Sequence, residues 1–93
     1  MDTKEEIIKT IKNIQRKIQS KQKTVKELEQ KRDELLANNQ LDLATQADIA
    51  IINSDIADLN TSIFFLLRDQ ALFTEQLNTI LKLEESTNQP QPN

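Results

Sequence analysis

Apolar residues recur at alternating intervals of three and four along most of the 93-residue chain. This seven-residue repeat is typical of helices that pack along their whole length, as in a coiled coil. Two such series occur, and we call each one a seam. The first seam is Ile7, Ile11, Ile14, Ile18, Lys21, Val25, Leu28, Arg32 and Leu35. The second is Ile49, Ile52, Ile56, Leu59, Ile63, Leu66, Gln70, Phe73, Leu77 and Ile80.

The two seams are out of phase, and the slip falls in the sequence ANNQLDLATQ. Asn38 and Asn39 are poor helix formers that tolerate the left-handed conformation ending many helices. Asp42 or Thr45 can cap a following helix, and Thr45 is followed three residues later by an acidic residue. The sequence therefore predicts an all-α antiparallel hairpin over residues 1–85. Its expected parts are a helix at about 3–38, a loop at about 38–44 and a helix at about 42–85.

The distribution of charge favours this hairpin over the alternative, one continuous helix that pairs in parallel with a second copy. Seven basic and no acidic residues lie within 9–26, whereas four aspartates and no basic residue lie within 42–58. A hairpin places these opposite charges together, whereas a parallel dimer places like charges together. The seam residues Lys21 and Arg32 can extend their charges outward into solvent or meet aspartates of the second helix, depending on the register. The candidate aspartates are Asp48, Asp55 and Asp58.

One short segment resembles the Rop family of plasmid RNA-binding hairpins, which dimerise into four-helix bundles. The segment is NQLDLATQADI at 39–49, and it resembles the loop and second-helix start of that family. The shared residues are Asn39, Leu41, Asp42, Gln46, Ala47, Asp48 and Ile49. The resemblance covers about a tenth of the chain and implies architecture alone, so no functional residue is carried over from it.

The composition argues against catalysis and against a bound cofactor. The chain has no glycine, cysteine or histidine, which excludes zinc ribbons, thiol nucleophiles and glycine-rich phosphate loops. Its carboxylates are dispersed at helical spacing instead of gathered in a loop, as a calcium site requires. We therefore expect no enzyme, no cofactor and no metal site.

The segment SIFFLLRDQALF at 62–73 has more apolar residues than one helical neighbour requires. Those outside the seam continue a second apolar stripe along the second helix, and the first helix has no comparable stripe. The expected interface residues are Ile51, Phe64, Phe65, Leu67, Ala71 and Leu72. The expected occupant is a second copy, giving a homodimeric four-helix bundle. The alternatives are a heterologous helical protein and a monomer with exposed phenylalanines.

A line of basic residues lies opposite the first seam and spans roughly 25 Å. We call it the basic stripe, and it consists of Lys9, Lys12, Arg16, Lys23 and Lys26. A solvated helix face is the simpler interpretation of such a run. The alternative is a site for an anion such as a nucleic-acid backbone, although no aromatic residue accompanies the stripe.

The remaining expectations concern the tail, the location and the function. Residues 86–93, STNQPQPN, are polar and contain two prolines, which predicts disorder. No signal peptide or membrane-length apolar run is evident, so a cytoplasmic protein without a membrane contact is expected. The predicted function is a protein–protein interaction module, such as a small adaptor, assembly factor or chaperone-like subunit. The alternative is a nucleic-acid-binding regulator that uses the basic stripe.

Overall fold

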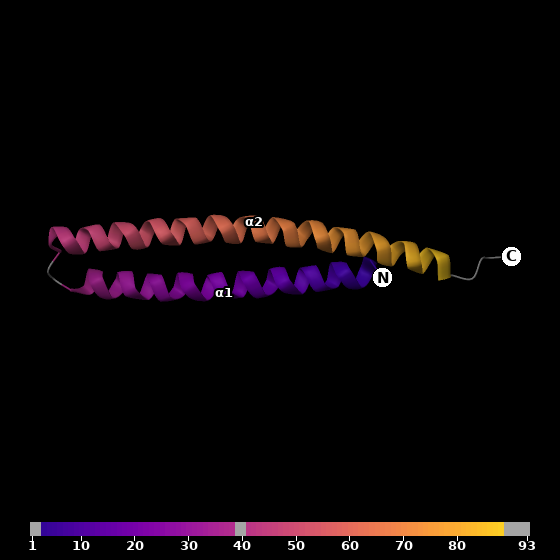
Figure 1. Cartoon of the computed structure of the whole chain (residues 1–93), viewed down its shortest axis with the longest axis horizontal. Coiled ribbons are helices and arrows are strands. Elements are labelled where there is room, and N and C mark those ends of the chain that lie inside the picture. Colours follow the sequence, from indigo (N-terminus) through magenta and orange to yellow (C-terminus); the bar gives the residue numbers. More distant parts are fainter. Residues whose placement is uncertain (1–2, 39–40, 89–93) are drawn as a thin grey trace.

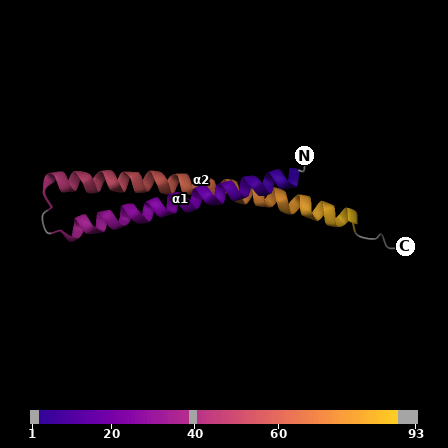
Figure 2. The ribbon, with the colours of Figure 1, turned by 60° about the horizontal axis from the view of Figure 1, so that its bottom comes forward.

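The computed structural model describes residues 3–38 and 41–88, which form an antiparallel pair of long helices (Figure 1). Helix α1 covers Thr3–Ala37 and helix α2 covers Leu43–Asn88. The helices stay side by side and cross at a shallow angle (Figure 2). The radius of gyration is 21.7 Å, whereas a compact domain of this length has about 12 Å. The predicted all-α hairpin is confirmed, and it is elongated.

The two seams form the core between the helices. Every seam position is buried or half-buried, including the polar positions Lys21, Arg32 and Gln70. The most buried side chains are aliphatic and β-branched: Ile7, Ile14, Ile18 and Val25 of α1, and Ile52, Ile56 and Ile63 of α2. Leucines from both helices and Phe73 pack around this cluster. Within the described residues, no polar or charged side chain is fully buried, so the most buried part of the core is apolar.

Polar contacts between the helices lie toward the two ends of the hairpin. Lys4 Nζ donates to Glu84 Oε2 at 3.1 Å, near the start of α1. Arg32 Nη1 donates to Asn53 Oδ1 at 3.2 Å, near the loop. Arg32 therefore meets an amide of α2 and none of the three candidate aspartates, and its guanidinium lies 3.6 Å from the Asp33 carboxylate.

The predicted charge complementarity acts through space more than through contacts. Lys21 lines a shallow hollow together with Asp55 and Asp58. Among residues 3–38 and 41–88, however, the one ion pair within 4.0 Å that joins the helices is Lys4–Glu84. The basic run of α1 and the aspartates of α2 thus attract one another over longer, solvent-screened distances, which favours the antiparallel arrangement and adds little stability.

Asp42 caps the start of α2. Its Oδ1 accepts a hydrogen bond from the Thr45 backbone N–H at 2.8 Å, the contact expected of an N-cap residue. The Gln46 N–H donates to the Asp42 carbonyl at 3.0 Å, and Gln46 Nε2 donates to the Leu41 carbonyl at 2.9 Å. Thr45, the other candidate cap, lies inside the first turn. Leu43 and the following residue, where the predicted loop and the predicted second helix overlap, belong to α2.

The end of α1 differs from the prediction. The helix ends at Ala37, and no described residue has a positive φ angle. Asn38 therefore terminates α1 without the left-handed conformation that the sequence indicated. Asn39, the other residue to which this prediction applied, lies outside the described part of the chain.

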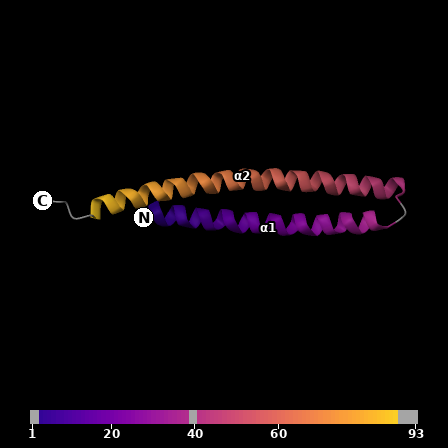
Figure 3. The ribbon, with the colours of Figure 1, turned by 180° about the vertical axis from the view of Figure 1, so that it is seen from behind.

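Helix α2 continues three residues beyond its predicted end near Glu85. It ends at Asn88, so the first three residues of the expected disordered tail are helical, while 89–93 lie outside the described residues. Ser, Thr and Asn each cost only a few tenths of a kcal/mol more than good helix formers. The first residue that opposes a helix strongly is Pro90, which also restricts the residue before it. With Glu84 opposite Lys4, the last turn of α2 extends past the start of α1 (Figure 3).

The core predicts a large effect of truncating Ile52, which is only 5% exposed. The substitution Ile52→Ala should lower the free energy of unfolding by about 2–4 kcal/mol, because it removes buried methyl groups and leaves a cavity. Urea unfolding followed by circular dichroism measures this change. The matched control is Leu83→Ala, whose side chain is 64% exposed. Equal losses in the two variants would contradict the assignment of the core.

The cap predicts a pH dependence. The Thr45 backbone N–H, and secondarily its hydroxyl, hold the pKa of the Asp42 carboxyl below its ordinary value of 3.8. Because the pKa is lower in the folded state, the resulting stability is present above that ordinary value and is lost as the pH falls through the folded pKa. Wild type should therefore lose more thermal stability on acidification than Asp42→Asn, whose amide oxygen caps without titrating. Thermal melts over a pH series measure this difference, and an equal fall in melting temperature for wild type and Asp42→Asn would contradict the role of the cap.

Candidate interaction surfaces

The six predicted interface residues are all exposed in the hairpin. We call the surface that they form the outer face of α2. Phe64 is 63% exposed, Ile51 is 60% exposed and Leu72 is 54% exposed. Phe65, Leu67 and Ala71 are exposed as well. The single chain thus leaves uncovered the apolar surface that the sequence assigned to a partner.

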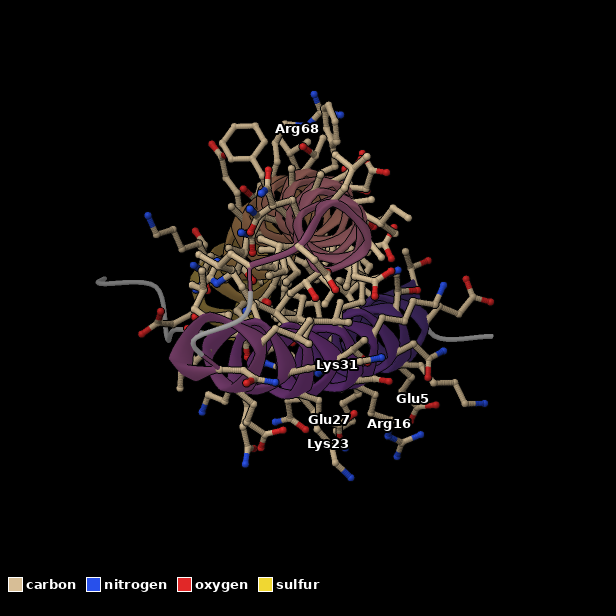
Figure 4. All side chains as sticks on the ribbon, turned by 90° about the vertical axis from the view of Figure 1, so that its left-hand side faces the viewer. Glu5, Arg16, Lys23, Glu27, Lys31 and Arg68 are labelled. Atoms are coloured by element: carbon tan, nitrogen blue, oxygen red, sulfur yellow. The ribbon has the colours of Figure 1, made fainter. Side chains whose placement is uncertain are left out.

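The aromatic residues of the outer face are arranged around Arg68. The rings of Phe64 and Phe65 make an edge-to-face contact with centroids 5.7 Å apart and planes at 73°. The Arg68 guanidinium carbon lies 5.1 Å from the centre of the Phe65 ring, within the range of a cation–π interaction. Arg68 projects from the side of α2 opposite α1 (Figure 4). The Phe65–Arg68 pair therefore faces away from the core.

The side chains of the outer face change in size along α2. Toward the loop it carries small exposed residues, whereas from Phe64 onward it carries large ones. Leu43 and Ile51 are the exceptions, and they are 84% and 60% exposed. The small exposed residues are Ala44, Ala47, Ala50, Ser54, Ala57 and Thr61. A helix can approach the small half more closely than the large half.

The structure also exposes apolar residues that the sequence interpretation did not single out. Leu81 is 43% exposed and Leu83 is 64% exposed, close to the end of α2. Leu83 lies eighteen residues, or five helical turns, after Phe65, so it projects from the same side of α2 as Phe65. This helical spacing was the signal that could have identified Leu83.

The five residues of the basic stripe are all exposed on α1. Arg16 and Lys23 point away from α2, on the side of the molecule opposite Arg68 (Figure 4). Glu5 and Glu27 project from the same side of α1, so acidic residues border the stripe. The basic stripe and the outer face of α2 are therefore separate surfaces on opposite sides of the hairpin.

The described residues contain no group of three or more acidic, histidine or cysteine side chains placed to hold a metal ion. The hollows on the surface are shallow grooves. One of about 330 Å³ lies between the helices beside Val25 and Ile63, and its polar lining comes from Gln22, Lys26 and Glu29 together with Asn60.

By length and composition alone, Leu43–Thr87 of α2 is apolar enough to cross a membrane, a property that the sequence interpretation did not anticipate. Only 17% of its most apolar window is buried within the chain. Asp48, Asp55 and Asp58 interrupt the first half of the helix. Each aspartate at the centre of a bilayer costs about 2.5–3.5 kcal/mol, which disfavours insertion.

No protein-family model matches the chain, and neither a curated protein nor a solved structure is significantly similar to it. Its function is therefore inferred from the chemistry of its own surfaces.

Proposed function

We propose that this protein is a non-catalytic protein–protein interaction module that acts through the outer face of α2. A small adaptor, an assembly factor and a chaperone-like subunit all fit this role. The observation that carries the proposal is the exposure of Phe64, Phe65 and Leu72 on the side of α2 away from its core. Contiguous apolar clusters exposed on small domains usually mark contact sites. The interrupting aspartates favour a protein partner in the cytoplasm over a membrane.

The proposed partner is a second copy, which completes a four-helix bundle. The solvent-accessible surface of the chain is 7492 Å², whereas a compact monomer of its mass exposes about 5500 Å². Two chains together therefore carry roughly 4000 Å² of excess surface. Permanent dimers bury about 2000–5000 Å² in total, so the excess surface of two chains lies within the range that a dimer interface can bury. A bundle also supplies the apolar burial that a two-helix domain lacks.

The outer face predicts that two charges on it disrupt association. In the variant Phe65→Asp with Leu72→Asp, the carboxylates would have to lie in the apolar contact, which costs several kcal/mol. The intramolecular seam keeps Ile63, Leu66 and Phe73. The mass from sedimentation or light scattering should fall from two chains to one, and circular dichroism should still report helix.

The matched control places two aspartates at the same spacing on exposed positions of α1, as Asn13→Asp with Ser20→Asp. This variant should remain dimeric. A wild-type chain that is monomeric at high micromolar concentration would overturn the homodimer. A monomer that floats with phospholipid vesicles would replace the protein partner with a lipid surface and would overturn the proposal.

A second candidate function, binding to a nucleic-acid backbone, is supported by the position of the basic stripe. All five of its side chains are exposed, and Arg16 and Lys23 point directly away from α2 (Figure 4). The stripe therefore stays accessible when the outer face of α2 is covered. The net charge of −3 opposes long-range attraction to phosphates, so any binding depends on this local surface.

The basic stripe predicts a salt-dependent mobility shift with RNA or DNA. Replacing Lys9, Arg16 and Lys23 with Gln should abolish the shift or lower the slope of log affinity against log salt by about 2–3, roughly one for each phosphate that the protein no longer neutralises. The control removes the same charge elsewhere, by replacing the exposed Lys17, Lys31 and Lys82 with Gln. The absence of a shift for wild type at low salt would eliminate this function.

A further inference from the structure

The outer face of α2 carries a second series with heptad spacing, and this series determines how a second copy can pack on it. Its positions follow one another at intervals of three and four on the side away from α1. They are Ala47, Ala50, Ser54, Ala57, Thr61, Phe64, Arg68 and Ala71, all exposed. The larger exposed residues Ile51, Phe65 and Leu72 border the series on one side. A helix packed here would therefore make contact over at least six turns of α2.

The direction in which a second copy packs follows from the sizes of the side chains along the outer face. In a parallel pair, each Phe64 would face the other Phe64, and small residues would face small residues with a gap between them. In an antiparallel pair, the large half of each α2 covers the small half of the other. Helices pack most tightly when large side chains interlock with small ones, so the change in size along the face selects the antiparallel direction.

Charge supports the same direction. The segment 42–67 contains four aspartates and no basic residue. Arg68 is the basic residue of the outer face nearest to the phenylalanines, and its side chain is 59% exposed. An antiparallel second copy brings Arg68 over the acidic half of its partner, whereas a parallel copy places the two Arg68 side chains together. Opposite charges favour the first arrangement.

Asp58 fixes the alignment among the antiparallel arrangements that fit the heptad spacing. It lies on the same flank of the series as Ile51, Phe65 and Leu72. A shift of one heptad in one direction places Asp58 against Ile51 of the second copy, and a shift in the other places it against Phe65. In the alignment between these two, Phe65 meets Ile51, and Phe64 meets Ser54. The two Asp58 residues meet at the edge, where water hydrates them and screens their repulsion, which costs less than placing either carboxylate against an apolar residue.

We propose that a second copy of this chain packs its α2 antiparallel against the outer face of α2, with the two-fold axis between Ala57 and Thr61. This arrangement rests on the proposed function and specifies its partner. Phe64 of each copy lies over Ser54 of the other, and Arg68 lies over Ala50. The two α1 helices take the outside of the bundle, and the basic stripes remain on its surface.

Distances between labels on the two copies test the direction and the axis. The chain has no cysteine, so a single introduced cysteine carries one spin label per copy. With Asn60→Cys, next to the axis, the labels should lie within about 20 Å of each other. With Thr74→Cys they should be separated by roughly 45 Å along the bundle, because each residue away from the axis adds twice the helical rise.

A pair of substitutions tests the alignment. Ser54→Phe alone should place two phenylalanines in the same space and raise the dimer dissociation constant about tenfold or more. Phe64→Ser alone should leave a cavity and act in the same direction. The combined variant exchanges the partners at both symmetry-related contacts and should restore affinity to within about threefold of wild type. Both positions are exposed in the hairpin, and circular dichroism verifies that each variant folds.

The outcomes separate this arrangement from the proposed function. Short distances at both label positions would show a parallel pair, and a combined variant weaker than either single variant would show a different alignment. Either result overturns the antiparallel packing while the dimer remains. A monomeric wild type would overturn the arrangement and the homodimer together.

Discussion

The apolar seam between α1 and α2 is the interaction on which the rest of the structure depends. Isoleucine and valine supply all of its most buried side chains, and these branched residues have few rotamers to lose on burial. Neither helix has another described element to pack against. Long helices in water are held mainly by the packing of one face. The seam also determines where the outer face and the basic stripe point, because both surfaces lie on the side of their helix opposite the seam.

The two helices contribute unequally to the surface of the hairpin. Helix α1 has one apolar face and is polar or charged elsewhere, so pairing with α2 covers most of its apolar residues, while Leu36 near the loop stays 50% exposed. Helix α2 has apolar residues on two sides, and pairing with α1 covers only one of them. The second half of α2 has six charged residues: Arg68, Asp69, Glu75, Lys82, Glu84 and Glu85. This asymmetry is the reason for proposing α2 as the centre of the bundle and α1 as its outer layer.

The sequence predicted the parts of the structure that depend on periodicity. The heptad spacing identified both seams, and every position that it assigned to the core is at least half-buried. The same spacing identified the exposed outer face of α2, since residues left outside a two-helix seam have no neighbour in the hairpin. The reversal in the order of the intervals, from four then three in the first seam to three then four in the second, located the connection between Leu35 and Ile49. These features follow from the geometry of the helix alone.

Details that depend on competition between similar local structures were not predictable. Asp42 and Thr45 both match the preferences of a cap, and only the backbone path shows that Asp42 accepts the hydrogen bond. Asn38 ends α1 without a left-handed residue. Arg32 could reach several polar groups, and the side-chain positions select Asn53. The last turn of α2 persists because its residues are only slightly unfavourable in a helix.

The polar residues in the seams give the hairpin a means of alignment. A heptad seam made of similar aliphatic side chains looks nearly the same after a shift of seven residues, and polar groups in the seam are the usual means of preventing such a shift. Lys21, Arg32 and Gln70 occupy half-buried seam positions. A shift of one repeat would place each of them against a different part of the other helix, and it would break the Arg32–Asn53 and Lys4–Glu84 contacts toward the two ends of the hairpin. The few interruptions of the aliphatic pattern therefore distinguish one alignment from the next.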